Sequence, residues 1–433
     1  MVSTRKAKPT ESAWEIVLSS LGVSEELSKL GYVEIQATEL KRMSGLEPRI
    51  LAKMDFSSQR PKSFVERNLN ILPIQNGNYR IGQFDVFKKI EKTKNEPIFV
   101  NSPMNFQSIS DVTSSEGIAL RKAEISTMID RFSGEHVVHT FSGRERSPNF
   151  DFRVKNYDKS YSTINVSGVQ IEVDGGFEGE NSIYIFEVKN QSAEDFNVRQ
   201  LYFPYRTYMA KATKPIRCIY LVHAYDVFNF FEYRFVDPLN MSSIELVQSQ
   251  SYYLKNPVIK LEQVLISNPK KVWRPPNEVP FPQADLITAV IEIVKIAGAS
   301  GVTTDELIES LEFTSRQLEV GGGYYPNAAK YLGLAYFDNS GLQAKLIASE
   351  DFQSAARSGD SEVTSLVISR ISQIPGVRGI LDIWVKENRI ASLNEVVTEM
   401  QVFIQFSSLS ETTQKRRAQT IRAWCIWVIQ HSS

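Results

Sequence analysis

The sequence is poor in the residues that build disulfide frameworks and zinc sites. It contains two cysteines, Cys218 and Cys425, and four histidines in 433 residues. The cysteines are too few and too far apart for a disulfide framework, and the histidines show no metal-ligand spacing beside cysteines or acids. We therefore interpret both cysteines as buried apolar residues.

Long apolar runs and an excess of either charge are also missing. No stretch reaches the roughly 18–20 apolar residues of a membrane span, and no apolar region near the N-terminus marks a secretory signal. We therefore expect a cytoplasmic protein without a membrane partner. The formal net charge is −1, so nucleic-acid binding would have to come from local basic patches. The sequence has no GxxxxGK[ST] and no complete GxGxxG after a strand, which argues against an ATPase, helicase or methyltransferase.

Composition otherwise describes a globular protein, with 42% hydrophobic and 23% charged residues. A chain of this length exceeds one compact core, so two to four domains are expected. Five prolines in 268–282 mark the clearest boundary. We predict an N-terminal α+β domain (1–105), a central α/β core (106–267), a proline-rich linker (268–282), a domain of three helices and a hairpin (283–350) and a helical C-terminal region (351–433).

The central stretch 169–190, VQIEVDGGFEGENSIYIFEVKN, predicts two strands joined by a glycine-containing loop. Alternation places Asp174 and Glu172 on the polar face of the first strand, and Glu187 with Lys189 on one face of the second. Charges beside an apolar hairpin are costly to desolvate, so their placement indicates function rather than stability.

Metal-assisted phosphodiester hydrolysis is the chemistry that fits these residues. Asp174 and Glu187 supply hard oxygen ligands for Mg²⁺, a cation that keeps several waters and takes few protein carboxylates. Lys189 would lie within reach of a metal-bound water, which it could orient or help to deprotonate, and its charge would offset that of the phosphate. Glu172, on the face of Asp174, is a further candidate.

The pattern Asp174…Glu187-Val188-Lys189 resembles the PD-(D/E)XK nuclease superfamily, although Val173 replaces the proline that names the motif. The resemblance implies an α/β core with a mixed central sheet flanked by helices, in the superfamily's element order αβββαβ. The segment 195–212 predicts a helix that begins at an Asp195 N-cap. The resemblance also implies a Gln or Arg on this helix, here Gln200 and Arg199, and an acid from the first core helix. Glu116 is our candidate for that acid, with Glu124 as the alternative, on a helix expected over 113–133. The longer run from Gln170 to Arg206 resembles type II restriction endonucleases.

Basic residues of the first two domains are candidate DNA contacts. The punctuated segment 141–156 is expected to be a DNA-facing loop. Upstream, 37–55 predicts two helices and Asn76-Gly77 predicts a hairpin within 69–82. These elements outline either a winged helix or a small α+β domain that only packs against the core. The candidates are Arg144, Arg146, Arg153 and Lys155 in the loop, and Arg42, Arg49, Lys53 and Arg60 in the N-terminal domain.

The C-terminal half carries the stronger resemblance to a DNA reader. A helix at 284–297, a capping box from Thr303 to Glu306, a helix at 324–333 and a hairpin follow one another. The run GGGYYPNAAKYLGL resembles the third helix of the winged-helix module of several restriction endonucleases. The helix 410–430 begins with basic residues and ends apolar, as suits a recognition helix. The candidate contacts are Arg316, Gln317, Asn327 and Lys330, then Lys415, Arg416, Arg417 and Arg422.

We therefore expect a type II restriction endonuclease that hydrolyses double-stranded DNA with Mg²⁺. One site per chain and two antiparallel strands per duplex predict a homodimer reading a palindrome. Host protection would require a separate cognate DNA methyltransferase. The alternative is a DNA-binding regulator or repair-associated protein that uses a nuclease fold as a scaffold.

Overall fold

The computed structural model describes residues 9–21, 30–91, 93, 95–103, 108–109, 113, 115–191, 193–224, 227–255, 260–262, 265, 281–311 and 313–432. Two compact units divide the chain. The first contains 1–98 and 113–252, and the second contains 99–112 and 253–433. Most of the predicted linker, 268–280, lies outside the described residues.

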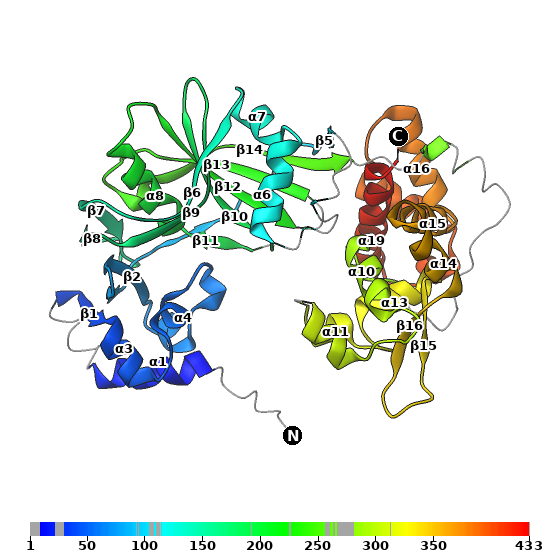
Figure 1. Ribbon diagram of the computed structural model, residues 1–433, viewed down its shortest axis with the longest axis horizontal. Coiled ribbons are helices and arrows are strands. Elements are labelled where there is room, and N and C mark those ends of the chain that lie inside the picture. The colour runs from blue at the N-terminus through cyan, green and yellow to red at the C-terminus, as the bar shows by residue number, and fades with distance from the viewer. Residues whose placement is uncertain are drawn as a thin grey trace. The chain divides into compact units, whose positions relative to one another are not determined.

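The first unit begins with a small α+β region (Figure 1). Trp14 and Phe64 pack edge to face in its core, with ring centroids 4.5 Å apart. The predicted hairpin around Asn76-Gly77 is present, and Gly77 takes the positive φ of 76° that this turn requires. The strands form a sheet in the order β1-β3-β2. The elements are α1 (Pro9–Ser20), β1 (Tyr32–Gln36), α3 (Ala37–Ser44), α4 (Pro48–Ala52), η1 (Ser57–Gln59), α5 (Lys62–Glu66), β2 (Asn70–Gln75) and β3 (Asn78–Gly82).

A mixed seven-stranded sheet forms the centre of the first unit, which confirms the predicted α/β class. Its order is β5-β14-β13-β12-β10-β9-β6. β10 runs parallel to β12 and antiparallel to β9, and α8 is the crossover between the two parallel strands. The elements are β4 (Phe87–Lys89), β5 (Ile98–Asn101), α6 (Glu116–Ile125), α7 (Met128–Ser133), β6 (Val138–Arg146), β7 (Phe150–Lys155), β8 (Tyr161–Val166), β9 (Gln170–Glu178), β10 (Ile183–Lys189), β11 (Asp195–Asn197), α8 (Arg199–Met209), β12 (Ile216–Ala224), β13 (Val227–Phe235), η2 (Met241–Ser243) and β14 (Ile244–Lys255).

Both α6 and α8 pack against β9, β10 and β12 (Figure 1). Tyr220, which pairs with Glu187 across the sheet, belongs to the apolar core that α8 covers. The next residue of β10, Phe186, points to the other face. There it contacts Phe230, which in turn contacts Phe132 of α7. All seven residues of β10 are buried, so the candidate charges lie on a central strand rather than at a hairpin edge.

Three local predictions are corrected by the structure. The helix expected over 113–133 is two helices, because Thr127 takes a positive φ of 60° between α6 and α7. The loop expected over 141–156 is largely the strands β6 and β7, paired with β9 and β8. Asp195 does not cap α8; its Oδ1 accepts the backbone N–H of Ser57 at 2.8 Å, and β11 precedes the helix.

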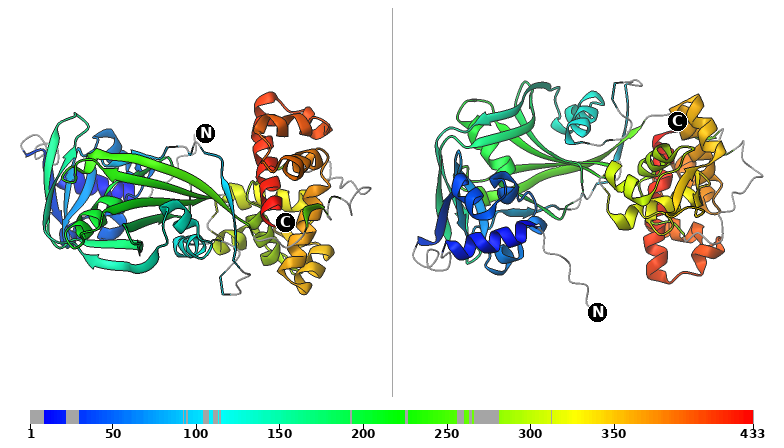
Figure 2. Two further views of the ribbon diagram at one scale, coloured as in Figure 1. Left: turned by 90° about the horizontal axis from the view of Figure 1, so that it is seen from above. Right: turned by 60° about the horizontal axis from the view of Figure 1, so that its bottom comes forward.

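The second unit is mainly helical, with one hairpin (Figure 2). The predicted capping box between Thr303 and Glu306 is present. The helices α15 to α18 all contact the long helix α19. The elements are α10 (Ile287–Ala297), α11 (Thr304–Ser310), α12 (Ser315–Leu318), α13 (Tyr324–Tyr331), β15 (Ala335–Asp338), β16 (Lys345–Ala348), α14 (Glu350–Ser358), α15 (Asp360–Ser372), α16 (Val377–Glu387), α17 (Leu393–Met400), α18 (Ile404–Ser407) and α19 (Glu411–Gln430).

Within the second unit, side chains of α13 and α19 lie close together. The rings of Tyr331 and Trp424 lie 6.3 Å apart. One step of seven residues earlier in both helices, Tyr324 and Arg417 interact electrostatically. As for membrane spans, no helix among the described residues is long and apolar enough to cross a bilayer.

Candidate active site

The structure brings together the three residues at the centre of the sequence prediction. Asp174 lies on β9, and its Oδ2 accepts the backbone N–H of Val188 at 2.8 Å. This bond fixes the Asp174 carboxylate against β10, between Glu187 and Lys189 along the chain. The Nζ of Lys189 donates to Oε1 of Glu187 at 2.5 Å. Two adjacent strands therefore present two carboxylates and one ammonium at the same point of the sheet.

Glu116, the acid predicted from the first core helix, also reaches this point. It is the first residue of α6, after Ser115, whose hydroxyl caps the helix by accepting from the N–H of Ile118. The Oε1 of Glu116 lies 3.5 Å from Nζ of Lys189. The helix approaches β9 closely at Gly175, where an added Cβ would lie 2.4 Å from Leu120. Glycine after Asp174 thus permits α6 to deliver Glu116.

Gln200, predicted from the second core helix, completes the contacts of Glu187. Its Nε2 donates to Oε1 of Glu187 at 2.5 Å. Its own Oε1 is buried and has no hydrogen-bond partner in the described part of the chain. An unsatisfied buried acceptor beside a buried carboxylate is costly unless a ligand or an ordered water supplies a donor. The amide of Gln200 is therefore placed to hold a small polar group beside Glu187.

Burial dominates the ionisation of both carboxylates. It raises the pKa of Glu187 to about 8, against the opposing charge of Lys189. It also raises the pKa of Asp174, against the N–H of Val188 and the charge of Lys189. A low-dielectric site destabilises charged carboxylates, and a bound cation compensates that cost. The site also holds more acids than bases: Asp55, Glu116, Asp174 and Glu187 against Lys189 and Arg199.

Two other acids predicted for the site, Glu172 and Glu124, pair with arginines instead of Lys189, and Arg144 and Arg146 were predicted as DNA contacts. Glu172 is exposed and pairs with Arg144 at 3.3 Å on the surface of the sheet. Glu124, the alternative to Glu116, pairs with Arg121 and does not contact Lys189. Arg146 is exposed at the end of β6. Glu172, predicted as a catalytic residue, does not contact Lys189; it pairs with Arg144 instead.

Arg199 lies beside the site, at the start of α8. Burial lowers its pKa, and the charges of Asp55, Glu187 and Tyr79 oppose this shift. Its guanidinium makes no hydrogen bond or ion pair within the described residues, and it lies 5.9 Å from the ring centroid of Phe203. Such a cation next to two carboxylates remains available to an anionic ligand.

The DNA-contact residues predicted in the second unit fall into two groups. Around Tyr324, Arg316 is exposed and lies 5.4 Å above the ring, and Arg417 approaches from α19. The Nε and Nη1 atoms of Arg417 are buried without a partner in the described part of the chain. Arg416 is exposed beside it. The remaining candidates are engaged or covered: Lys415 pairs with Glu411, Arg422 donates to the carbonyl of Ala391, Gln317 accepts from Thr314, Lys330 lies over Phe337 and Asn327 is buried.

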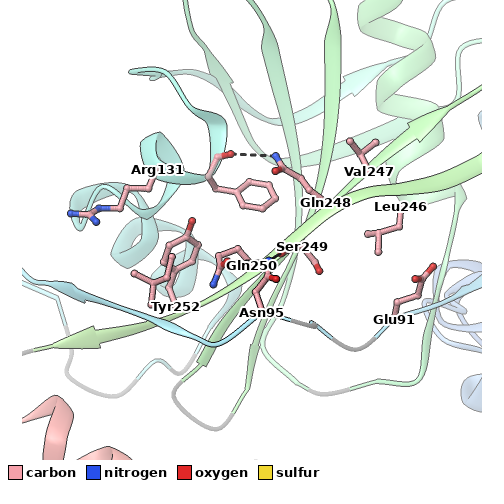
Figure 3. Close-up of a pocket in the computed structure, with 11 residues that line it drawn as sticks. Glu91, Asn95, Arg131, Leu246, Val247, Gln248, Ser249, Gln250 and Tyr252 are labelled. Carbon is pink, nitrogen blue, oxygen red and sulfur yellow. Dashed lines mark hydrogen bonds between the residues drawn. The ribbon is translucent and has the colours of Figure 1, made fainter. Parts of the chain in front are cut away.

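A pocket of about 440 Å³ opens on a different part of the first unit (Figure 3). It is lined by β14 from Leu246 to Gln250, by Tyr252 and by the segment around Asn95. Among its lining residues, Gln248 donates to the carbonyl of Phe132 at 3.4 Å (dashed line in Figure 3). None of the residues described above as contacting Glu187 or Lys189 lines this pocket, so it is not the candidate active site.

Sequence reasoning missed a hydrogen-bonded chain that borders the site. Nδ1 of His223 lies 2.9 Å from Oδ1 of Asn190, the residue after Lys189, and Nδ2 of Asn190 donates to the carbonyl of Thr113. Because an amide oxygen only accepts, His223 carries its proton on Nδ1. Burial, together with the charge of Lys122, lowers the pKa of His223 to about 3. The position of Asn190 next to Lys189 was the one available signal in the sequence.

Three family models match the chain, and all three describe domains of unknown function. Residues 11–81 match DUF6996, residues 82–253 match DUF6997 and residues 289–433 match DUF7226. No curated protein and no solved structure matches the chain. Asp174, Glu187, Lys189, Glu116 and Gln200 all fall within the second of these domains, whereas Asp55 falls within the first.

Proposed function

We propose that this chain is a type II restriction endonuclease, which hydrolyses phosphodiester bonds of double-stranded DNA with Mg²⁺. The observation that carries the proposal is the convergence of Asp174, Glu187 and Lys189. Their two strands are adjacent, and Lys189 lies 2.5 Å from Glu187. Folding alone does not favour this convergence, because buried ion pairs rarely stabilise a protein more than apolar residues of the same volume.

The donor set suits Mg²⁺. Oδ1 of Asp174 and Oε2 of Glu187 accept no hydrogen bond within the described residues, which leaves two carboxylate oxygens for a cation. No cluster of three or more His, Cys, Asp or Glu side chains fit to hold a metal occurs in the described part of the chain. Mg²⁺ takes one or two carboxylates and keeps waters, so a two-carboxylate site fits it better than zinc or calcium. When bound, Mg²⁺ supplies Lewis-acid activation and lowers the pKa of a coordinated water.

The remaining residues position the reacting groups. Lys189 presents an ammonium held between Glu187 and Glu116, where it orients the attacking water and stabilises charge on the phosphate. Gln200 fixes the Glu187 carboxylate from the helix side. Arg199 supplies the free cation for a phosphate oxygen. Each role uses a group that is already oriented by the fold.

The order of elements supports the PD-(D/E)XK core. Counted along the chain, α6, β6, β9, β10, α8 and β12 give helix, three strands, helix, strand. The strands lie in the order β6-β9-β10-β12, and only β10 and β12 of these are parallel. This order supports the αβββαβ arrangement that the resemblance implies, if α7, the β7–β8 hairpin and β11 are counted as additions to it.

DNA binding is assigned to the second unit. Its elements α10, α11, α13 and the β15–β16 hairpin follow the order of a winged helix, with the short helix α12 added. Arg316 lies over the ring of Tyr324, and Arg417 interacts electrostatically with Tyr324 and with its neighbour Arg416. Guanidinium nitrogens without a partner in the described part of the chain, as in Arg417, suit phosphate oxygens. A homodimer would then place one active site on each strand of a palindromic duplex.

The experiment is incubation of the purified chain with supercoiled plasmid, with Mg²⁺ or with EDTA. The proposal predicts linear products in Mg²⁺ only, and sequencing their ends gives one recurring site. The second candidate is a DNA-binding regulator. The basic residues around Tyr324 are the one observation that favours it. This candidate predicts a duplex retained on the protein and a plasmid that stays supercoiled under both conditions.

A further inference from the structure

Asn190 makes a second contact between the end of β10 and the entrance to α6. It follows Lys189 directly, and its Nδ2 donates to the carbonyl of Thr113 at 2.9 Å. Three residues after Thr113, Glu116 begins α6, and its Oε1 lies 3.5 Å from Nζ of Lys189. The hydrogen bond and the ion pair therefore join the same two places in the chain, the end of β10 and the entrance to α6.

Both partners of this hydrogen bond are held by further side chains. The hydroxyl of Thr113 accepts from Nζ of Lys122, a buried lysine of α6, at 3.0 Å. Oδ1 of Asn190 accepts from Nδ1 of His223 at 2.9 Å. His223 is buried on β12, the strand beside β10. The chain of hydrogen bonds thus runs from the sheet to α6, and it fixes the direction in which the amide of Asn190 faces.

The ion pair between Glu116 and Lys189 needs such support. The side chain of Glu116 is 45% exposed, and its 3.5 Å contact exceeds the length of about 2.7–2.9 Å that is usual for a charge-assisted hydrogen bond. A half-exposed ion pair of this length contributes little energy and does not locate a helix by itself. The cap at Ser115 bonds to Ile118 within the helix, so it does not fix α6 relative to the strand.

We propose that Asn190 is a positioning residue of the active site, which holds the entrance to α6 so that Glu116 meets the ammonium of Lys189. His223 acts in turn on Asn190, by fixing the direction of its amide. This inference rests on the proposed nuclease function. The ammonium lies between Glu187 and Glu116, so a shift of Glu116 lets it leave the place from which it orients the attacking water. The effect belongs to cleavage rather than duplex binding, which is assigned to the second unit.

A double-mutant cycle tests the link between Asn190 and Glu116. Single-turnover cleavage in Mg²⁺ and duplex binding in Ca²⁺ are measured for the full-length chain, Asn190→Leu, Glu116→Gln and the double variant. Leucine has nearly the shape of asparagine but cannot donate to Thr113. Asn190→Leu should slow cleavage by about 10- to 100-fold, because a small displacement of a reacting group costs that much, with duplex binding within about twofold. The double variant should be about as slow as Glu116→Gln alone.

A pair of variants at His223 separates positioning from packing. Asparagine carries Nδ2 one bond from Cγ, where histidine carries Nδ1, so His223→Asn keeps a donor for Asn190. His223→Leu keeps a buried side chain of similar size and removes that donor. Cleavage should fall about 10-fold in His223→Leu and be largely restored in His223→Asn. The control is Asn181→Ala near the other end of β10, whose exposed amide donates to Glu135 at 3.1 Å and whose loss should leave cleavage unaltered.

The outcomes separate the possibilities. Non-additive losses with intact binding, and restoration by His223→Asn, support the proposal. Additive losses, equal losses in both His223 variants, or wild-type cleavage by Asn190→Leu while Asp174→Asn is inactive, overturn it and leave the nuclease function standing. Wild-type cleavage by Asp174→Asn contradicts the nuclease site and this inference together. If Asn190→Leu does not fold, Asn190→Asp takes its place in the cycle, since aspartate keeps an acceptor for His223 and loses the donor to Thr113.

Discussion

The side-chain nitrogen of Gln200 and the ammonium of Lys189 donate to the same oxygen, Oε1 of Glu187, each at 2.5 Å. Two donors on one oxygen leave the other carboxylate oxygen of Glu187 without a partner in the described part of the chain. They also fix the rotation of the carboxyl group, so the free oxygen has one direction. Under the proposed function, this free oxygen is the one that would face the cation.

The first prediction concerns Gln200. Gln200→Leu removes a hydrogen bond to a charged group, worth about 1.5–3 kcal/mol, so the cleavage rate should fall about 10- to 100-fold. Duplex binding in Ca²⁺ should change little, because Gln200 contacts Glu187 and not the surface around Tyr324. Single-turnover cleavage and fluorescence anisotropy of the same variant measure the two quantities. An unchanged cleavage rate would remove Gln200 from the site.

The second prediction concerns packing at β9. A Cβ on Gly176 would lie 2.1 Å from Cε2 of Phe141, so Gly176→Ala should lower the free energy of unfolding by about 1–3 kcal/mol. Gly117→Ala is the matched control, since nothing lies within 4 Å of its added Cβ. Gly117 lies in α6, where alanine in place of glycine should raise the free energy of unfolding by up to about 1 kcal/mol. Urea unfolding followed by circular dichroism distinguishes the two; equal midpoints would contradict the close approach.

The third prediction concerns pH. Since the pKa of His223 is about 3 in the fold and near 6.5 when unfolded, the unfolded chain alone takes up this proton as pH falls from 6.5 towards 3. The contribution of His223 to the free energy of unfolding is therefore complete above pH 6.5. Below pH 6.5 it declines, by at most about 1.4 kcal/mol per pH unit. His223→Asn keeps a donor for Asn190 and does not titrate. Its urea midpoint should fall less than that of the unaltered chain between pH 7 and pH 4.5; parallel falls would exclude His223 as a source.

The fourth prediction concerns DNA binding by the second unit. If Arg316 and Arg417 contact phosphates, Arg316→Gln and Arg417→Gln should each make the slope of log K against log salt shallower by about 0.9. The effect should be alike for all duplex sequences. Arg357→Gln, an exposed arginine on α14, should leave the slope unchanged. Equal slopes for all three variants would place the DNA contact elsewhere.

The sequence predicted that the residues of the candidate site lie together, because most of them are close to one another along the chain. Alternation along β9 and β10 placed Asp174, Glu187 and Lys189, and the resemblance added Glu116 and Gln200. The sequence predicted a loop over 141–156, because glycine and proline interrupt that stretch. In the structure Phe150, Phe152 and Val154 are buried on one face of β7, so much of the stretch is a strand. The sequence also predicted that Asp195 caps α8, although Asp195 accepts from Ser57. No pattern in the sequence joins Thr113 to Asn190, so this contact follows from tertiary structure alone.

The central claim is that Asp174 and Glu187 bind the cation that drives DNA cleavage. The most direct measurement compares plasmid cleavage in Mg²⁺ by the unaltered chain, Asp174→Asn and Glu178→Gln. Glu178 lies on the same strand, and its exposed carboxylate pairs with Lys214. We predict complete loss of cleavage for Asp174→Asn with duplex binding retained, and unaltered cleavage for Glu178→Gln. Cleavage at the unaltered rate by Asp174→Asn would contradict the account.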